Sequence, residues 1–134
     1  MVVPTFVRQA LSGEPLTVYG DGLQSRCFSN VSDITEGMVL MANSQKANGE
    51  IFNLGDTHEI TILDLAKRII DLTGSASKIT HLSYKDAYEE GFEDMRHRKP
   101  DIEKAMKFFG WKPRYSLDDT LKSVINLERQ KLKK

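Results

Sequence analysis

The sequence predicts a mixed α/β fold (α+β, short strands with about five helices) in a single domain spanning residues 1–134. Two observations favour this class. Apolar residues recur at helical spacing in several segments, and short runs of β-forming residues lie between those segments, with turn residues at their ends. A length of 134 residues also suits one domain with a modest core.

The first half of the chain alternates helix and strand signals. In order, we expect a helix over residues 2–11, a strand over 16–19, a Gly-Asp-Gly turn over 20–22, a strand over 27–31, and a helix capped by Ser32 or Asp33 that runs to about Asn43. Glu36 stands where it would complete a capping box from Asp33. The apolar residues of this last helix wrap more than one face, which predicts that it is covered on two sides.

The second half carries clearer helix boundaries. We expect a strand over residues 50–54, a helix capped by Thr61 with Asp64 at its third position and Gly74 at its end, a strand over 78–84, a charged loop over 85–99, a two-turn helix from Asp101 to Gly110, and a last helix opened by a Ser116–Asp119 capping box. The two-turn helix should bury Ile102, Ala105, Met106 and Phe109.

Composition excludes several classes of function. Lys+Arg and Asp+Glu balance at 19 each, so no global field recruits nucleic acid or an acidic membrane. Cys27 is the only cysteine, which excludes an internal disulfide and cysteine-rich metal sites and fits a reducing, cytoplasmic location. No apolar run reaches membrane-span length, and the N-terminus lacks a signal-peptide pattern. The three histidines show no metal-ligand spacing.

One candidate binding stretch runs from Leu16 to Phe28. A short β run ends at Tyr19, the permissive Gly20-Asp-Gly22 turn follows, and Arg26 then offers a planar fork for phosphate or carboxylate. Such a stretch can hold a planar base at one end and an anion at the other. A hairpin whose arginine is only solvated accounts for the same residues. The turn is not a dinucleotide fingerprint, because its third glycine is missing and β-like residues follow it.

A second candidate cluster comprises Asp94, Arg96, His97 and Arg98. Two arginines at positions i and i+2 of an extended segment point the same way, which favours a phosphate clamp. Asp94 can orient them or accept hydrogen bonds from ribose hydroxyls. A solvated, salt-bridged loop is the alternative. Neither cluster holds an obvious acid–base pair or nucleophile, so the residues indicate anion or nucleotide binding before they indicate catalysis.

Five motifs occur in order and at fitting distances: Pro15-Leu-Thr-Val-Tyr-Gly-Asp-Gly-x-Gln-x-Arg-x-Phe28, Val31-Ser-Asp33, Phe52-Asn-Leu-Gly55, Arg98-Lys-Pro-Asp101 and Gly110-Trp-Lys-Pro113. Together they resemble the C-terminal half of the extended short-chain dehydrogenase/reductases that act on nucleotide sugars. That family includes UDP-glucuronate decarboxylase, UDP-glucose 4-epimerase and dTDP-glucose 4,6-dehydratase. The resemblance covers essentially the whole chain and implies the substrate-binding part of such an enzyme, lacking most of the Rossmann domain.

The resemblance implies a set of substrate-binding residues and no catalytic or metal-binding ones. They are Thr17 and Tyr19 at the nucleobase, Arg26 at the diphosphate, Phe28 near the ribose, His58 in a loop lining the nucleotide pocket, Asp94 at the nucleoside, and Arg96 or Arg98 as the second diphosphate arginine. The expected ligand is a UDP- or dTDP-sugar.

The same resemblance implies what the chain lacks. The family's glycine-rich NAD fingerprint and its catalytic Tyr-x-x-x-Lys pair precede the matching region, and neither occurs in this sequence. We therefore expect no NAD binding and no catalysis by this chain alone, an N-terminal NAD-binding domain as partner, and an apolar patch on the helix near residues 29–43 that packs against it. Family members usually form homodimers through that domain. A non-catalytic nucleotide-binding or regulatory module, or a structural remnant, remains the alternative.

Overall fold

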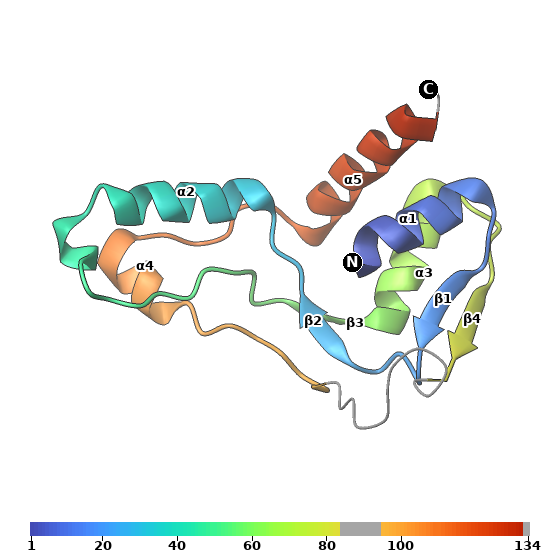
Figure 1. The fold of residues 1–134 in the computed structure, drawn as a ribbon, viewed down its shortest axis with the longest axis horizontal. Helices are drawn as coiled ribbons and strands as arrows, with labels where there is room; N and C mark the ends of the chain where they lie inside the picture. The colour runs from blue at the N-terminus through green and yellow to red at the C-terminus, as the bar shows by residue number, and fades with distance from the viewer. Residues whose placement is uncertain (84–94, 133–134) are drawn as a thin grey trace. The chain divides into compact units, whose positions relative to one another are not determined.

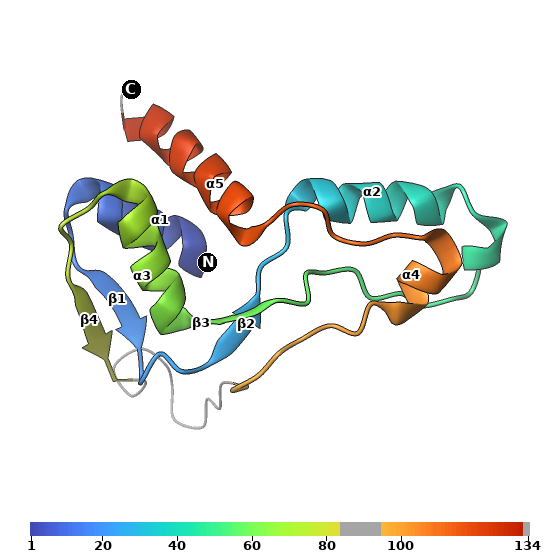
Figure 2. The same ribbon diagram turned by 180° about the vertical axis from the view of Figure 1, so that it is seen from behind.

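The computed structural model describes residues 1–83 and 95–132 (Figures 1 and 2). Asp94 therefore lies outside the described residues. The elements are α1 (Val2–Ser12), β1 (Leu16–Tyr19), β2 (Ser25–Cys27), α2 (Val31–Ala42), η1 (Gln45–Ala47), β3 (Glu59–Thr61), α3 (Ile62–Thr73), β4 (Ile79–Leu82), α4 (Glu103–Phe109) and α5 (Leu117–Leu132). The predicted mixed class, with short strands and five α-helices, is confirmed in the described part of the chain.

The chain divides into two compact units. The first contains Met1–Arg26, Ile60–His97 and Leu121–Lys134, and the second contains Cys27–Glu59 and Arg98–Thr120.

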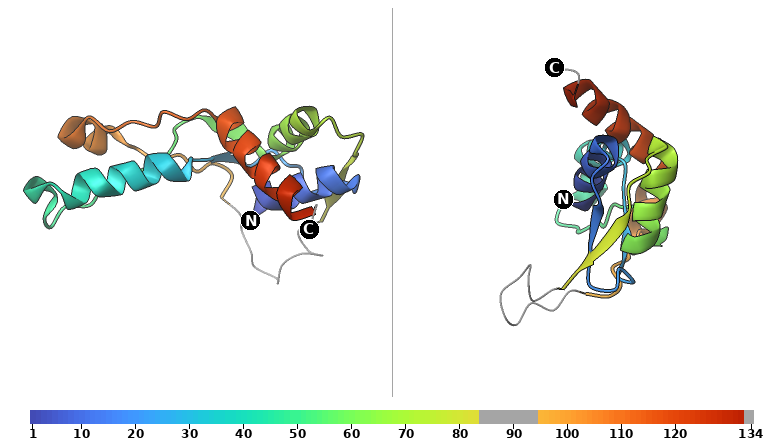
Figure 3. Two further views of the ribbon diagram at one scale, coloured as in Figure 1. Left: turned by 90° about the horizontal axis from the view of Figure 1, so that it is seen from above. Right: turned by 90° about the vertical axis from the view of Figure 1, so that its right-hand side faces the viewer.

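The first unit is built on a parallel pair of strands. Leu16 of β1 pairs with Ile79 of β4, and Tyr19 pairs with Leu82. Leu16 and Val18 are fully buried, whereas the alternate side chains Thr17 and Tyr19 are not, as the two-residue period of a strand requires. Helices α1 and α3 contact each other and β1, and both lie beside the strand pair in Figure 3. Tyr19 thus ends a buried strand with its ring at the surface.

Local sequence accounts for the helices of this unit. α1 buries Phe6, Val7 and Ala10 and ends at Gly13, whose φ of 72° is left-handed. The predicted Thr61 cap of α3 is confirmed, because the hydroxyl of Thr61 accepts the backbone N–H of Asp64 at 3.0 Å. The apolar stripe of α3 is buried at Ile62, Leu65, Ala66 and Ile69.

The turn after β1 is fastened to the first turn of α3. The N–H groups of Ile62 and Leu63 donate to the carbonyls of Gln24 and Gly22, each at 3.0 Å. Gly22 has φ +73°, and a Cβ there would lie 2.7 Å from the side chain of Val18. Only glycine therefore fits this position without a shift. The strand after the turn, β2, pairs with β3 and not with β1, so the hairpin interpretation is wrong.

The second unit has a small core around Trp111. Trp111 is 2% exposed and packs with Ile102 and Ala105, and four half-buried apolar residues surround them: Leu40, Phe52, Leu54 and Phe109. Figures 1 and 2 show α4 beside α2. The indole Nε1 donates to the carbonyl of Asp33 at 2.9 Å, so the core is also tied to α2 by a buried hydrogen bond.

Several predicted boundaries in this unit are wrong. α2 starts at Val31 and is capped by Asn30, whose side chain accepts the Ser32 N–H at 2.9 Å, and Glu36 pairs with Arg114 instead of closing a capping box. The strand expected over 27–31 is the shorter, earlier β2, and residues 50–54 form no strand. Met106 is 45% exposed, because only one side of the two-turn α4 faces the core.

None of the helices in the described residues is both long and apolar enough to cross a membrane. The same part of the chain contains no group of three or more histidine, cysteine, aspartate or glutamate side chains arranged for a metal ion.

Candidate functional site

The predicted residues of the first unit gather where β1 ends. We define the strand-end cluster as Tyr19, Asp21, Gln24, Arg26 and Arg96. Tyr19 leaves 36% of its surface in solvent. Two residues earlier on β1, the hydroxyl of Thr17 accepts the Gln9 side-chain amide at 3.0 Å, and the Thr17 N–H donates to Oε1 of Gln9 at 3.2 Å. Two hydrogen bonds from Gln9 of α1 therefore fix Thr17, which lies two residues before Tyr19 on the same strand.

Arg26 is half-buried and bonded to the backbone. Its Nη1 donates to the carbonyls of Ser25 and Met95, each at 2.7 Å. The second of these bonds joins β2 to a stretch of chain 69 residues later. Arg26 is thus a fixed guanidinium in this unit and not the freely solvated side chain that the alternative interpretation assumed.

Residues 95–97 lie against β2 through further bonds. The Ser25 N–H donates to the Arg96 carbonyl at 2.7 Å, and the Ser25 hydroxyl lies 2.9 Å from Nδ1 of His97. Ser25 is only 6% exposed, whereas His97 is exposed, and the contact braces residues 95–97 against β2. Together with Arg26, these bonds bring the second arginine, Arg96, to the end of β1.

Arg96 pairs with the turn. Its Nη1 lies 3.2 Å from Oδ2 of Asp21, with the two side chains 70% and 48% exposed. The other Asp21 oxygen accepts the Leu23 N–H at 2.9 Å. These contacts lower the pKa of Asp21, first through the Leu23 hydrogen bond and further through the charge of Arg96, against an opposing effect of desolvation. The Arg96 side chain is therefore aligned along the turn.

Sequence reasoning missed three residues that shape this cluster. Asp21 and Gln24 stood inside the quoted motif without a role, and their spacing within a glycine turn was the available signal. His81 gave no local signal; it donates from Nδ1 to the Gly20 carbonyl at 2.8 Å and so fastens the turn to β4. The Gly20–Gly22 turn is followed by β2 and opens no helix, so these residues do not fit the pyrophosphate of NAD.

Three predicted residues belong to the second unit. Phe28 is half-buried and Arg98 is exposed. The His58 side chain is 90% exposed, and its Nδ1 lies 2.7 Å from Oδ1 of the buried Asp56. Because a carboxylate only accepts, Nδ1 carries the proton, which leaves Nε2 as the outward-facing atom.

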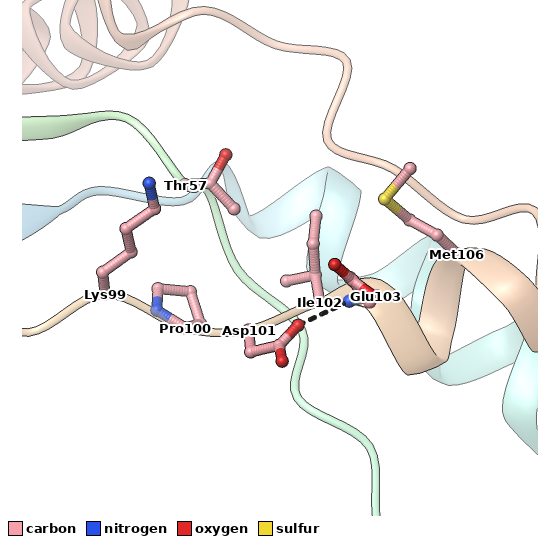
Figure 4. Close-up of a pocket in the computed structure, with 7 residues that line it drawn as sticks. All are labelled: Thr57, Lys99, Pro100, Asp101, Ile102, Glu103 and Met106. Carbon is pink, nitrogen blue, oxygen red and sulfur yellow. Dashed lines mark hydrogen bonds between the residues drawn. The ribbon is translucent and has the colours of Figure 1, made fainter.

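Two hollows of about 490 Å³ each lie in the second unit. The first, drawn in Figure 4, is lined by Thr57, Lys99, Pro100, Asp101, Ile102, Glu103 and Met106. There Asp101 accepts the Glu103 N–H at 2.9 Å, but the N-cap of α4 is Ile102, so the helix begins later than the predicted start at Asp101. The second hollow is lined by Asp56, His58, Pro113, Arg114, Tyr115, Ser116, Leu117 and Asp118. Of the predicted site residues in the described chain, only His58 lines either hollow.

Comparison with known proteins then identifies the family. Residues 1–124 match the family described as GDP-mannose 4,6 dehydratase. The chain belongs to this family. It is 43% identical over 129 residues to a UDP-N-acetyl-alpha-D-glucosaminuronate decarboxylase of Bacillus cytotoxicus, covering 96% of this chain and 40% of that protein. It is 41% identical to UDP-glucuronic acid decarboxylase 1 of Xenopus tropicalis, covering 98% of this chain and 29% of that protein.

Solved structures agree with the family assignment. The chain is similar to UDP-glucuronic acid 4-epimerase of Bacillus cereus in complex with UDP-glucuronic acid and NAD, with a TM-score of 0.86 and 27% identity over 97% of this chain and 40% of that one. It is similar also to UDP-glucose 4-epimerase of Thermotoga maritima with UDP-glucose, with a TM-score of 0.86 and 28% identity over 98% of this chain and 40% of that one. The predicted family resemblance is confirmed, and the chain spans well under half the length of these relatives.

Proposed function

We propose that this chain holds the nucleoside diphosphate of a UDP-sugar, as the substrate-gripping part of an NAD-dependent nucleotide-sugar epimerase, dehydratase or decarboxylase. The observation that carries the proposal is the strand-end cluster, in which an exposed aromatic ring ends a parallel strand and two arginines from distant parts of the chain are bonded to the turn and segment next to it. Ligands of α/β proteins commonly bind at the carboxyl ends of parallel strands. The relatives' names favour uridine as the nucleoside.

In this proposal, different residues of the strand-end cluster contact the base and the diphosphate. Tyr19, steadied through Thr17, offers an aromatic face for the base. Arg26 and Arg96 supply charge-assisted donors to the diphosphate, to which guanidinium groups are well matched. We propose Phe28, His58, Asp94 and Arg98 as further contacts of the same ligand, on the ground of the family resemblance.

NAD and the acid–base chemistry belong, in this proposal, to an N-terminal NAD-binding domain outside this sequence. That domain supplies the hydride acceptor when NAD is bound, and this chain keeps the sugar oriented toward it. The proposal accounts for an exposed apolar surface on α2, where Val31, Met38 and Val39 are 74%, 58% and 54% exposed. A cytoplasmic location and a homodimer formed through that domain are part of the same proposal.

A nucleotide panel tests the gripping role. UDP, dTDP, CDP and GDP are added to the chain and the thermal unfolding midpoint is measured. At one hundred times its Kd, a ligand stabilises the folded state by about 2.7 kcal/mol. We expect UDP to raise the midpoint most. Arg26→Ala should weaken UDP binding by about tenfold to a hundredfold, since it removes charge-assisted bonds.

Two variants make the result specific. Arg8→Ala removes the same charge from an exposed position of α1, where the side chain only donates to the Pro4 carbonyl, and should leave UDP binding unchanged. Arg26→Lys keeps the positive charge but loses the planar guanidinium that can donate two parallel hydrogen bonds. No stabilisation by any of the four nucleotides would leave the chain a structural remnant. Stabilisation without NAD-dependent turnover, after an N-terminal domain from a relative is added, would indicate a regulatory binding module.

A further inference from the structure

Gln24 is a buried polar residue with one unsatisfied end. It is 8% exposed, and its Nε2 donates to the Tyr19 carbonyl at 3.3 Å. Its Oε1 is shielded from solvent, and within residues 1–83 and 95–132 no donor bonds to it. It is the single buried side-chain oxygen or nitrogen of these residues in that condition. Buried acceptors in folded proteins nearly always have a partner, so an orphan such as this one calls for an explanation.

The geometry of the turn fixes which atom is left over. A backbone carbonyl can only accept, so the amide nitrogen must face Tyr19 and the amide oxygen must face away from it. The backbone of the turn cannot relax to hide the oxygen, because the Gln24 carbonyl is bonded to the Ile62 N–H at 3.0 Å and Gly22 is packed against Val18. Oε1 is therefore a rigid acceptor held beside Tyr19.

We propose that Gln24 is a further ligand-binding residue, and that its Oε1 accepts a hydrogen bond from the nucleoside part of the bound UDP-sugar. This inference rests on the proposed function. The diphosphate cannot supply the bond, because its ionised oxygens only accept. An N–H of the base or an O–H of the ribose can. Leu23, the neighbour of Gln24, is 53% exposed, so the turn beside Gln24 lies at the surface.

With this role for Gln24, two residues of the same stretch would recognise different parts of the bound nucleotide. Arg26, two residues later, takes the phosphates through charge, and Gln24 takes the nucleoside through one uncharged hydrogen bond. The orphaned oxygen carries a cost in the free chain that is recovered only when a donor arrives. A residue of this kind improves binding at the expense of the stability of the unbound protein.

The test uses Gln24→Met, which keeps the length of the side chain and removes the acceptor, with Gln130→Met on the exposed face of α5 as the matched control. Binding of UDP and of inorganic pyrophosphate to the 134-residue chain is measured by calorimetry. We expect Gln24→Met to weaken UDP binding about tenfold, equivalent to about 1.4 kcal/mol, and to leave pyrophosphate binding unchanged. Gln24→Met also removes the Nε2 bond to the Tyr19 carbonyl, which offsets the relief of the buried acceptor, so the unfolding midpoint of this variant without ligand should stay close to that of the wild type.

Three analogues identify the donor on the wild-type chain. N3-methyl-UDP lacks the base N–H, and 2′-deoxy-UDP and 3′-deoxy-UDP each lack one ribose O–H. One of the three should bind about tenfold more weakly than UDP to the wild type and as well as UDP to Gln24→Met. If all three analogues match UDP on the wild type, or if Gln24→Met lowers the unfolding midpoint and keeps UDP affinity, the role of Gln24 is refuted while the proposed function stands. A UDP-bound structure with water on Oε1 would refute it as well. If the wild type binds neither UDP nor pyrophosphate, the proposed function fails and the inference fails with it.

Discussion

Replacing Asp33 by alanine removes an acceptor that joins the start of α2 to the loop before α5. Its side chain is 2% exposed, Oδ1 accepts the Arg114 N–H at 3.1 Å, and Oδ2 accepts the Tyr115 N–H at 3.2 Å. The Asp33 carbonyl also holds the indole of Trp111. One residue thus fastens α2 at three points to the link between α4 and α5, and its carboxylate lies in the first turn of a helix, where negative charge is favourable.

The expected loss of unfolding free energy follows from the two backbone N–H groups, of Arg114 and Tyr115, that lose their acceptor. A buried N–H without a partner costs about 1–3 kcal/mol, and alanine orphans two of them. Both N–H groups belong to exposed residues, so water can reach part of the site, and we expect the lower half of the sum, about 2–4 kcal/mol in the free energy of unfolding. Asp33→Asn keeps one acceptor oxygen and should lose about half as much, roughly 1–2 kcal/mol.

Trp111 provides the assay, because it is the only tryptophan and lies in the core of the same unit. Its fluorescence is followed through urea denaturation at 25 °C. Asp64 is the matched control: it also occupies the third position of a 12-residue helix, but its side chain is 57% exposed and bonded to Thr61 and Lys67. Asp64→Ala should lose about 1 kcal/mol or less. Equal losses for the two alanine variants would refute the reasoning.

Two further predictions concern the second unit. Gly37→Ala gains about 1 kcal/mol of helix propensity, but the new Cβ would lie 2.7 Å from the side chain of Leu54. We therefore expect the free energy of unfolding in the same urea assay to fall by about 1–2 kcal/mol. A rise in this free energy would contradict the packing. Burial raises the pKa of the Cys27 thiol, and the carboxylates of Glu59 and Asp56 raise it further against an opposing Lys99. Because only the thiolate reacts, alkylation of Cys27 by iodoacetamide should reach half its maximal rate at a higher pH than for a free cysteine, and Glu59→Gln should bring that pH down. A midpoint at or below that of free cysteine would show the sign to be wrong.

The parts of the fold that the sequence predicts well are those whose cause is local. The Thr61 cap is confirmed by the Asp64 N–H that donates to its hydroxyl, and the Ser116–Asp119 capping box is confirmed by reciprocal hydrogen bonds, since in each case the bonding groups lie within four consecutive residues. β1 is confirmed residue for residue, because it is a short apolar alternation bounded by turn residues.

The errors arise where tertiary contacts override the local pattern. Residues 50–54 have the composition of a strand, yet Phe52 and Leu54 are used to pack against the Trp111 core, and Phe52 meets Phe109 with ring centroids 4.8 Å apart. No strand partner is needed once those side chains are buried by a helix. The Asn30 cap was missed because a β-like run and a cap compete for the same residues, and only the pairing of β2 with β3 decides between them.

The candidate site depends on long-range contacts even more strongly, and this affects how its variants are interpreted. Arg26 donates to the Met95 carbonyl, so removing it takes away one of the bonds that hold the segment carrying Arg96 and His97, and the bonds from Ser25 remain. A loss of UDP binding in Arg26→Ala therefore combines a lost contact with a weakened scaffold. Arg26→Lys retains the charge and loses the fork, and Gln24→Met leaves both arginines in place. The variant that weakens UDP and spares pyrophosphate is the one that reports nucleoside recognition, because pyrophosphate has no nucleoside to lose.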